Sequence, residues 1–263
     1  MAIKPILFNT QMVRAILEGR KKTTRRIIKA KGYDITGIPS WAMFRRNPDD
    51  FFFDVCKTGK EPSSKTATTI LIEPPARPGD FLWVRETWNY GYVETSDAEG
   101  CNESWFEELR KPASGYLGAL SRYFYVADKD DEQIMSEIGG KWRPSIHMPR
   151  EAARLLLKVK DVQAERLQDM TEEDAICEGY DGMPWCYHHV FENYQDSPIP
   201  CDASSGYDCP PDRPCDKSIP ELFGETIWNS TIKQFDLHRY GWDANPFVWV
   251  MDFERIELPE NWN

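Results

Sequence analysis

The stretch Arg154-Leu155-Leu156-Leu157-Lys158-Val159-Lys160-Asp161-Val162 contains one of the clearest strand patterns in this chain. Apolar Leu155, Leu157 and Val159 alternate with Lys158 and Lys160, a period typical of a strand with one buried face. The pattern predicts a strand at 154–162 that lies half-buried in a sheet.

Further strands are predicted on both sides of this one. The turn-forming residues Pro78-Gly79-Asp80 precede 81–86, which are rich in β-branched and aromatic side chains. A short aromatic-rich strand is expected at 123–126, and the mostly apolar segment 247–256 is expected to close the chain as a buried strand.

Three helices are predicted from their capping patterns. Asn9 or Thr10 caps a helix that ends at Gly19, and Thr171 followed by acidic residues opens a helix that runs to Gly179. Ser218, with Glu221 three residues later, opens another helix. Its side chains expected on the core are Leu222, Ile227, Trp228, Thr231 and Phe235.

The order of these elements favours an α+β fold. Strands and helices do not alternate regularly, so a doubly wound parallel sheet is not expected. We expect a small, mixed or largely antiparallel β-barrel with helices at its rim. The predicted organisation is one domain over 1–263, with long insertions at about 31–76, 89–140 and 181–217, and 41% hydrophobic residues are ample for its core.

Composition limits the class of protein. No apolar run approaches the roughly 20 residues that span a bilayer, and the first residues lack the apolar core of a secretion signal. We therefore expect a cytoplasmic protein with no membrane partner. Seven cysteines without an export signal favour reduced thiols or metal ligands over disulfides.

Charge is distributed unevenly along the chain. The net charge is −11, yet residues 14–31 hold eight basic residues against one acidic residue, so this stretch carries +7 and the remainder −18. Such asymmetry suits a local anion site on an otherwise repelling body. The alternative is a solvated basic turn, because cations after a helix also interact favourably with its dipole.

Several stretches, in the correct order over about half of the chain, resemble the ASCH domain, a relative of the PUA RNA-binding fold. They are 16–21 (ILEGRK) with Thr24 and Arg26, then 78–80 (PGD), then 167–179, with flanking segments 142–150 and 240–246. These flanking segments are similar to a bacteriophage and prophage branch of that family. The resemblance implies a β-barrel with a cleft that binds RNA or a nucleoside and, for a phage-encoded protein, the bacterial cytoplasm as its location.

One catalytic branch of the family removes an acyl group from acetylated cytidine with a lysine, a threonine and a glutamate. By the matching motifs, these residues correspond to Lys21, Thr24 and Glu178. Lys22 and Arg25 stand where smaller or apolar residues are usual in that branch, which leaves the substrate open.

The residues themselves are compatible with this chemistry. A threonine hydroxyl needs a base, and a lysine serves as one only when its pKa is lowered. Nearby cations disfavour the charged form of Lys21 and form an anion-binding surround that can also stabilise an oxyanion. The surrounding cations are Arg20, Lys22, Arg25 and Arg26.

Two alternatives stay open at this site. Lys21 and Thr24 can instead bind phosphate, with Glu178 in a salt bridge that joins a helix to a loop. A ribonuclease is a further alternative, because lysines stabilise charge on a scissile phosphate, although no histidine pair with supporting spacing is present.

Other candidate nucleic-acid contacts lie outside this segment. Trp83 and Arg85 offer base stacking and phosphate contact, as in single-strand binders, although most tryptophans are core residues. His147, near Arg150, can face the cleft or be a core histidine. The sequence thus leaves two functional classes, a hydrolase of the amidohydrolase type and a non-catalytic reader. The partner expected for either class is RNA, single-stranded nucleic acid, modified DNA or a modified nucleoside.

A structural zinc site is predicted in the loop 181–217, and no other cofactor is expected. The candidate ligands are Cys201, Cys209 and Cys215, with Cys186 as fourth and His188 and His189 nearby. Their spacing lacks a Cys-x-x-Cys pair, so the alternative is a loop of free thiols.

Overall fold

The computed structural model describes residues 1–38, 50–60, 67–96, 103–108, 122–180, 218–259 and 262. The chain divides into two compact units, each built from segments that are distant in sequence. Unit 1 comprises 1–19, 78–160 and 253–263, and unit 2 comprises 20–77 and 161–252. That 1–263 form one domain with insertions stays a prediction.

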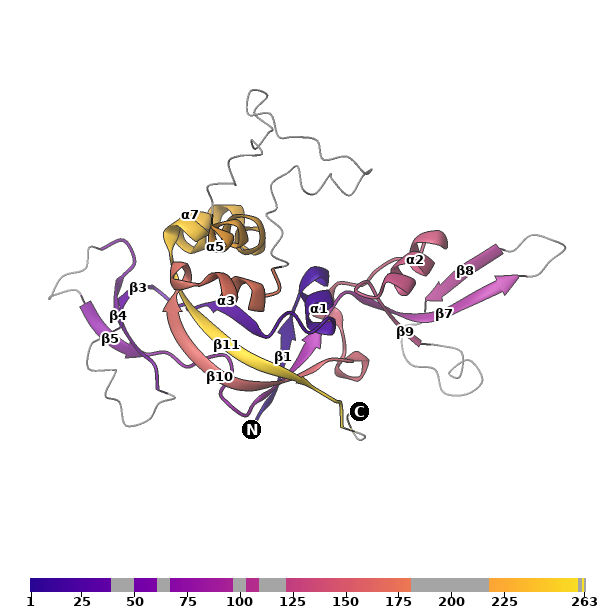
Figure 1. Ribbon diagram of the computed structural model, residues 1–263, viewed down its shortest axis with the longest axis horizontal. Helices are drawn as coiled ribbons and strands as arrows, with labels where there is room; N and C mark the ends of the chain where they lie inside the picture. Colours follow the sequence, from indigo (N-terminus) through magenta and orange to yellow (C-terminus); the bar gives the residue numbers. More distant parts are fainter. Residues whose placement is uncertain are drawn as a thin grey trace, which may run out of the picture. The chain divides into compact units, whose positions relative to one another are not determined.

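Unit 1 contains one end of the largest sheet. Strand β1 (Ile3–Leu7) pairs parallel with β6 (Phe81–Arg85), and β6 pairs antiparallel with β10 (Leu156–Arg166). Leu157 faces Leu82 in this register. The strand β11 (Phe247–Ile256) follows β10 in the sheet order, and both strands contribute residues to each unit (Figure 1).

A second sheet of unit 1 has the order β8-β7-β9, with both pairs antiparallel. Its strands are β7 (Trp88–Ser96), β8 (Glu103–Glu108) and β9 (Arg122–Tyr125). The helices of this unit are α1 (Thr10–Leu17) and α2 (Lys129–Glu137), with short 3-10 turns at Ser145–His147 and Arg150–Ala152.

In unit 1, Arg154 forms an ion pair with the buried carboxylate of Glu86. The guanidinium of Arg154 donates through Nε to Glu86 Oε1 at 2.9 Å and through Nη2 to Oε2 at 3.1 Å. Burial nevertheless raises the pKa of Glu86 above its ordinary value. The pair therefore satisfies a buried carboxylate rather than forming an exposed surface contact.

Unit 2 holds the segment predicted to carry function. Strand β2 (Thr23–Ile27) pairs antiparallel with β11, which follows β10, and Val250 faces Arg25. A separate antiparallel sheet has the order β3-β4-β5. Its strands are β3 (Tyr33–Gly37), β4 (Phe52–Lys57) and β5 (Ala67–Leu71).

Short helices cover one face of the β2–β11 pair in unit 2. They bury a cluster that includes Val248, Val250, Phe223 and Trp242, and α3 contacts α5 (Figure 1). The elements are α3 (Glu172–Cys177), α5 (Ile219–Phe223), α6 (Asn229–Thr231) and α7 (Leu237–Tyr240), with a π-helical turn at Gly224–Trp228 and 3-10 turns at Leu167–Asp169, Gln234–Asp236 and Trp242–Ala244.

Local capping patterns predicted the helix starts correctly. Asn9 accepts a hydrogen bond from Met12 N at 2.9 Å, and Gly19 follows α1 with a φ of +76°, as its predicted role requires. Thr171 and Ser218 each form a capping box with an acidic residue three positions on. The strands expected at 81–86, 123–126, 154–162 and 247–256 correspond to β6, β9, β10 and β11.

The helix expected from Ser218 through Phe235 is shorter than predicted. Ile232 takes an extended conformation, with ψ at 136°, and ends the helical run. Phe235 therefore lies on a separate 3-10 turn and is 70% exposed instead of packing on the core.

The fold class is mixed α+β with several antiparallel sheets, as expected. Within the described ranges the strands do not form a closed barrel. The range 31–76, predicted only as a long insertion, contains the sheet β3-β4-β5. No helix of the described ranges is long and apolar enough to cross a membrane.

Candidate functional site

The candidate site lies in unit 2, where the segment before β2 runs beside the end of α3. Two contacts fix this arrangement. The backbone N–H of Lys22 donates to Cys177 O at 2.8 Å, and Arg20 Nη1 donates to Gly179 O at 2.9 Å. The last carbonyls of a helix lack partners within the helix, so donors from residues 20–22 satisfy them here.

Lys21 and Glu178 meet at the centre of this arrangement. Lys21 Nζ donates to Glu178 Oε2 at 2.6 Å and to Glu178 O at 2.7 Å. Lys21 is 3% exposed and Glu178 4% exposed. Burial lowers the pKa of Lys21, and Arg26 and Arg25 act in the same direction, while Glu178 opposes them.

Arg25 extends the ion pair into a larger cluster. Its guanidinium donates to Glu165 Oε1 through Nε at 3.1 Å and Nη2 at 2.8 Å, and lies 3.6 Å from Asp174 Oδ1 and 3.5 Å from Glu178 Oε1. Burial disfavours the charged form of Arg25, but Glu178 and Glu165 outweigh it, so the pKa is raised. Three carboxylates thus surround a guanidinium that the sequence predicted to hold an outside anion.

Thr24 is buried, and its hydroxyl is engaged by a different residue. Thr24 is 1% exposed, and its Oγ1 accepts a hydrogen bond from Arg26 Nη1 at 2.9 Å. Among the described residues, Thr24 has no hydrogen bond to Lys21 or Glu178. Burial lowers the pKa of Arg26, and the nearby charge of Glu178 opposes this.

The predicted cations therefore differ in their surroundings. Lys22 is exposed and Arg20 and Arg26 are half-buried, while Lys21 and Arg25 are buried with carboxylate partners. Lys22 is therefore the most accessible of these five cations to a ligand that approaches from solvent.

The other predicted nucleic-acid contacts lie in unit 1. Trp83 is a buried core residue, with the Arg85 guanidinium 5.2 Å from its ring centroid, and Arg85 donates to Met148 O at 3.0 and 2.9 Å. His147 is exposed, and Arg150 lies 4.2 Å above the ring of Trp262.

The predicted zinc ligands Cys186, Cys201, Cys209 and Cys215 lie outside the described residues, as do His188 and His189. Within the ranges that the structure does describe, no group of three or more metal-ligating side chains is placed to hold an ion. The zinc site stays a prediction.

Two acidic members of the cluster were not selected as site residues from the sequence. Glu165 lies on β10, just beyond the predicted strand 154–162, and Asp174 was assigned only to the cap of α3. No local pattern marks them as site residues, because their partner Arg25 is 140 residues from Glu165. Comparison of the chain with protein-family models, curated proteins and solved structures finds no match.

Proposed function

We propose that this protein binds a modified nucleoside or nucleic acid in unit 2 and hydrolyses an amide bond there, using Lys21, Thr24 and Glu178. The observation that carries the proposal is that Lys21 Nζ is buried and is held by the side chain and the carbonyl oxygen of Glu178. Perturbed ionisable pairs of this kind are concentrated at functional sites. The ASCH-like assignment and its PUA-like barrel are part of the same proposal.

The proposed chemistry uses the lowered pKa of Lys21. Because burial disfavours the charged form of Lys21, its amine loses a proton more readily than an ordinary lysine. The neutral amine can then take the proton of the Thr24 hydroxyl as that oxygen attacks an acyl carbon. Arg26 then stands beside the reacting oxygen as a stabilising cation. Lys21 gives this proton to the departing amine as the C–N bond breaks and the acyl group becomes an ester of Thr24. Water then cleaves this ester, which releases the carboxylic acid and restores the Thr24 hydroxyl.

The proposal requires a rearrangement. Thr24 donates its proton to Lys21 only if its side chain leaves the arrangement in which it accepts from Arg26. Because Lys21, Thr24 and Glu178 are each 4% exposed or less, a ligand also reaches them only when neighbouring side chains move. The half-buried Arg26 is the side chain that this step must displace.

A non-catalytic reader is the second candidate, and the carboxylates around Arg25 favour it. Glu165, Asp174 and Glu178 neutralise the buried cations, so the cluster can serve to fix α3 against β2. Recognition would then depend on the outer cations Lys22 and Arg20.

The deciding experiment is incubation with N4-acetylated cytidine, its nucleotide and an acetylated oligonucleotide, with release of the acid measured by mass spectrometry. We expect hydrolysis by the wild type and a loss of at least ~100-fold in kcat/KM for Lys21→Met and Thr24→Val, the usual size of a lost general base or nucleophile. Thr36→Val is the matched control, because it also removes one hydroxyl hydrogen bond from a strand of unit 2.

Two results distinguish the candidates. Full activity of Thr24→Val rejects the proposed nucleophile. Binding of the oligonucleotide without any release of acid rejects the hydrolase and leaves the reader.

A further inference from the structure

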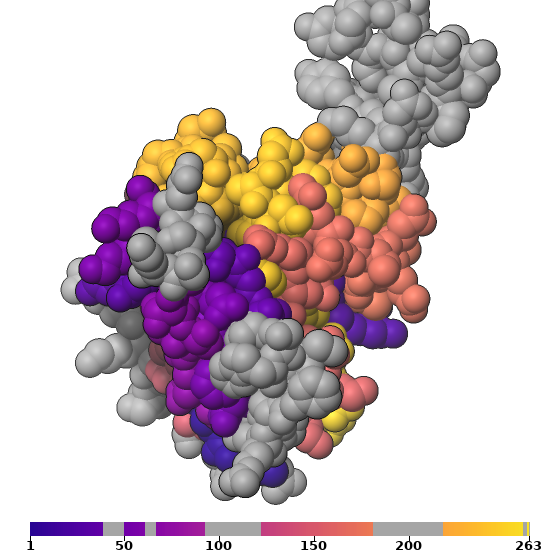
Figure 2. Space-filling view, turned by 90° about the vertical axis from the view of Figure 1, so that its left-hand side faces the viewer, coloured from indigo at the N-terminus to yellow at the C-terminus, as the bar shows by residue number. Residues whose placement is uncertain are grey.

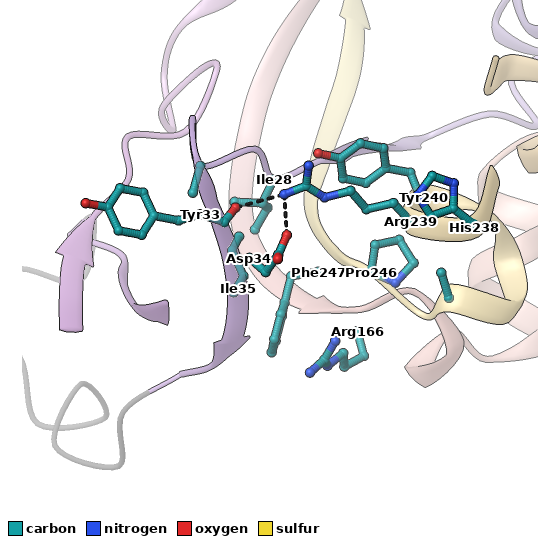
Figure 3. A pocket seen from close by; sticks show the side chains of 12 residues that line it. Ile28, Tyr33, Asp34, Ile35, Arg166, His238, Arg239, Tyr240, Pro246 and Phe247 are labelled. Carbon is teal, nitrogen blue, oxygen red and sulfur yellow. Dashed lines mark hydrogen bonds and ion pairs between the residues drawn. The ribbon is translucent and has the colours of Figure 1, made fainter. Parts of the chain in front are cut away.

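A pocket of about 270 Å³ lies in unit 2 and contains none of the residues of the Lys21–Glu178 cluster. It is walled by β3, by the end of β10, by the start of β11 and by α7 (Figure 3). Figure 2 shows the face of unit 2 on which the purple β3–β5 segments lie near the yellow helical segments, and Arg239 joins these two parts through Tyr33 O at 2.9 Å.

Arg166 is the distinctive cation of this pocket. Its Nη1 donates to Asn245 O at 2.9 Å, and its guanidinium lies 3.9 Å above the ring of Phe247. Burial lowers the pKa of Arg166, yet an arginine keeps its charge. Among the described residues, no carboxylate forms an ion pair with it. A half-buried guanidinium with donors to spare is suited to an anionic ligand.

Asn245 holds this guanidinium in place. It adopts the left-handed conformation, with φ at 46°, and its Oδ1 accepts a hydrogen bond from Gln168 N at 2.9 Å. Its backbone N–H also donates to Trp242 O at 3.0 Å, so Asn245 is held in place and its carbonyl orients Arg166 before a ligand arrives.

Arg239 stands across the pocket from Arg166 and is held differently. Figure 3 shows its side chain above Phe247 and Pro246, with Arg166 below them. Its Nη2 donates to Asp34 and to Tyr33 O, so one carboxylate already neutralises it. Among the arginine and aspartate side chains that line the pocket, Arg166 and Arg239 are cationic and Asp34 is anionic, which leaves one positive charge in excess.

An aromatic surface accompanies this charge. The ring of Tyr240 lines the pocket and has the Arg239 guanidinium 5.2 Å and the Lys29 ammonium 5.1 Å from its centroid. The ring of Tyr33, in contrast, points away from the other lining side chains (Figure 3). A flat ring flanked by cations is the kind of surface on which single-stranded nucleic acids stack a base.

From this arrangement we infer that the pocket binds one nucleotide, with its phosphate on Arg166 and its base against Tyr240. The volume is close to the lower limit of about 300 Å³ for ligand pockets, which suits a single nucleotide unit. A free nucleoside monophosphate and one nucleotide within a single strand carry the same chemistry, so both sources are tested. The inference concerns binding and stands apart from the proposed hydrolysis at Lys21.

The test is a calorimetric titration of the full chain with cytidine, cytidine monophosphate, inorganic phosphate and a short single-stranded oligonucleotide. We expect the monophosphate to bind at least ~10-fold more tightly than cytidine or phosphate alone, since each of these offers only half of the contacts. Tighter binding of the oligonucleotide than of the monophosphate assigns the pocket to a strand, and the reverse order assigns it to a free nucleotide.

Variants then locate the binding. Arg166→Gln is expected to weaken binding of the monophosphate at least ~10-fold, the loss of one charge-assisted phosphate contact. Lys160→Gln is the matched control, because it removes one positive charge from an exposed position on the same strand and should change affinity less than twofold. Tyr240→Leu should weaken binding, while Tyr240→Phe, which keeps the ring, should retain it.

Specific results would overturn the inference. Equal losses in Arg166→Gln and Lys160→Gln would show unspecific attraction, and equal affinity for cytidine and its monophosphate would remove the role of Arg166. Should Arg166→Gln fail to fold by circular dichroism, the Tyr240→Leu and Tyr240→Phe pair decides. Hydrolysis of an acylated nucleoside without binding of the monophosphate rejects the pocket alone, and binding without hydrolysis rejects the proposed enzyme alone.

Discussion

The Nζ of Lys21 lies 2.6 Å from Oε2 of Glu178, and both residues are buried. This relationship joins the segment before β2 to the end of α3 across 157 residues of sequence. An ion pair of this kind serves either to fix the fold or to carry chemistry, and its response to substitution and to pH separates the two uses.

The first prediction concerns the stability of this pair. Removing one partner of a buried ion pair leaves the other charge without compensation, which costs roughly 3–5 kcal/mol, while an apolar pair of similar volume is often tolerated. We expect Glu178→Gln to lower the free energy of unfolding by about 3 kcal/mol and Lys21→Met with Glu178→Leu to lie within about 1 kcal/mol of the wild type. Urea denaturation measures both. A double variant as unstable as Glu178→Gln would contradict this interpretation.

The second prediction is a rise in stability with alkaline pH. Burial lowers the pKa of Lys21 in the folded chain below its ordinary value of 10.5, so between these two values the unfolded chain binds more protons. The contribution of Lys21 to stability is therefore present above pH 10.5 and is lost as the pH falls through the folded pKa. The free energy of unfolding, measured in urea across this pH range, should change with pH at different slopes in the wild type and in Lys21→Met. Identical slopes would refute the lowered pKa of Lys21.

Parts of this fold could be predicted because their signals are local. The capping boxes of Thr171 and Ser218 join residues three positions apart, and the alternation along 154–162 needs no partner to be recognised. These patterns therefore predict element type and starting position even though the segments that pack on them lie far away in sequence.

The strand β2 could not be predicted in the same way. Its sequence Thr23-Thr24-Arg25-Arg26-Ile27 has no apolar alternation, so the charge suggested an exposed anion site. Arg25 is buried because Glu165, Asp174 and Glu178 meet it from β10 and α3. Long-range compensation of this kind leaves no local pattern, and the same is true of the pocket, whose walls come from three separate stretches of the chain.

The third prediction compares two adjacent hydroxyl groups on β2. Thr23 Oγ1 is buried and has no hydrogen-bond partner among the residues that the structure describes, whereas Thr24 Oγ1 accepts from Arg26 at 2.9 Å. A buried polar group without a partner costs about 1–3 kcal/mol, so Thr23→Val should stabilise the protein by about 1 kcal/mol. Thr24→Val should destabilise it by a similar amount. Thermal unfolding measures both variants, and a loss of stability in Thr23→Val would indicate that its hydroxyl has a partner.

The last prediction distinguishes the outer cation from the buried one. Lys22 is exposed, so Lys22→Glu should leave the fold intact and weaken binding of a single-stranded oligonucleotide. The slope of log affinity against log salt concentration should also become smaller, by the contribution of about one phosphate contact. Arg25→Glu should instead unfold unit 2, because it places a fourth carboxylate among Glu165, Asp174 and Glu178. Fluorescence anisotropy at several salt concentrations measures the binding of Lys22→Glu, and circular dichroism measures the folding of Arg25→Glu.

The control for Lys22→Glu is Lys60→Glu, which reverses one exposed charge of unit 2 at a position outside the candidate site. Because attraction at long range depends on the total charge, both variants lose some affinity at low salt. At about 0.15 M salt, attraction between distant charges is largely screened. If Lys22 contacts the oligonucleotide directly, Lys22→Glu should therefore still lose more affinity than Lys60→Glu at this salt concentration. Equal losses in the two variants would exclude Lys22 from the binding surface.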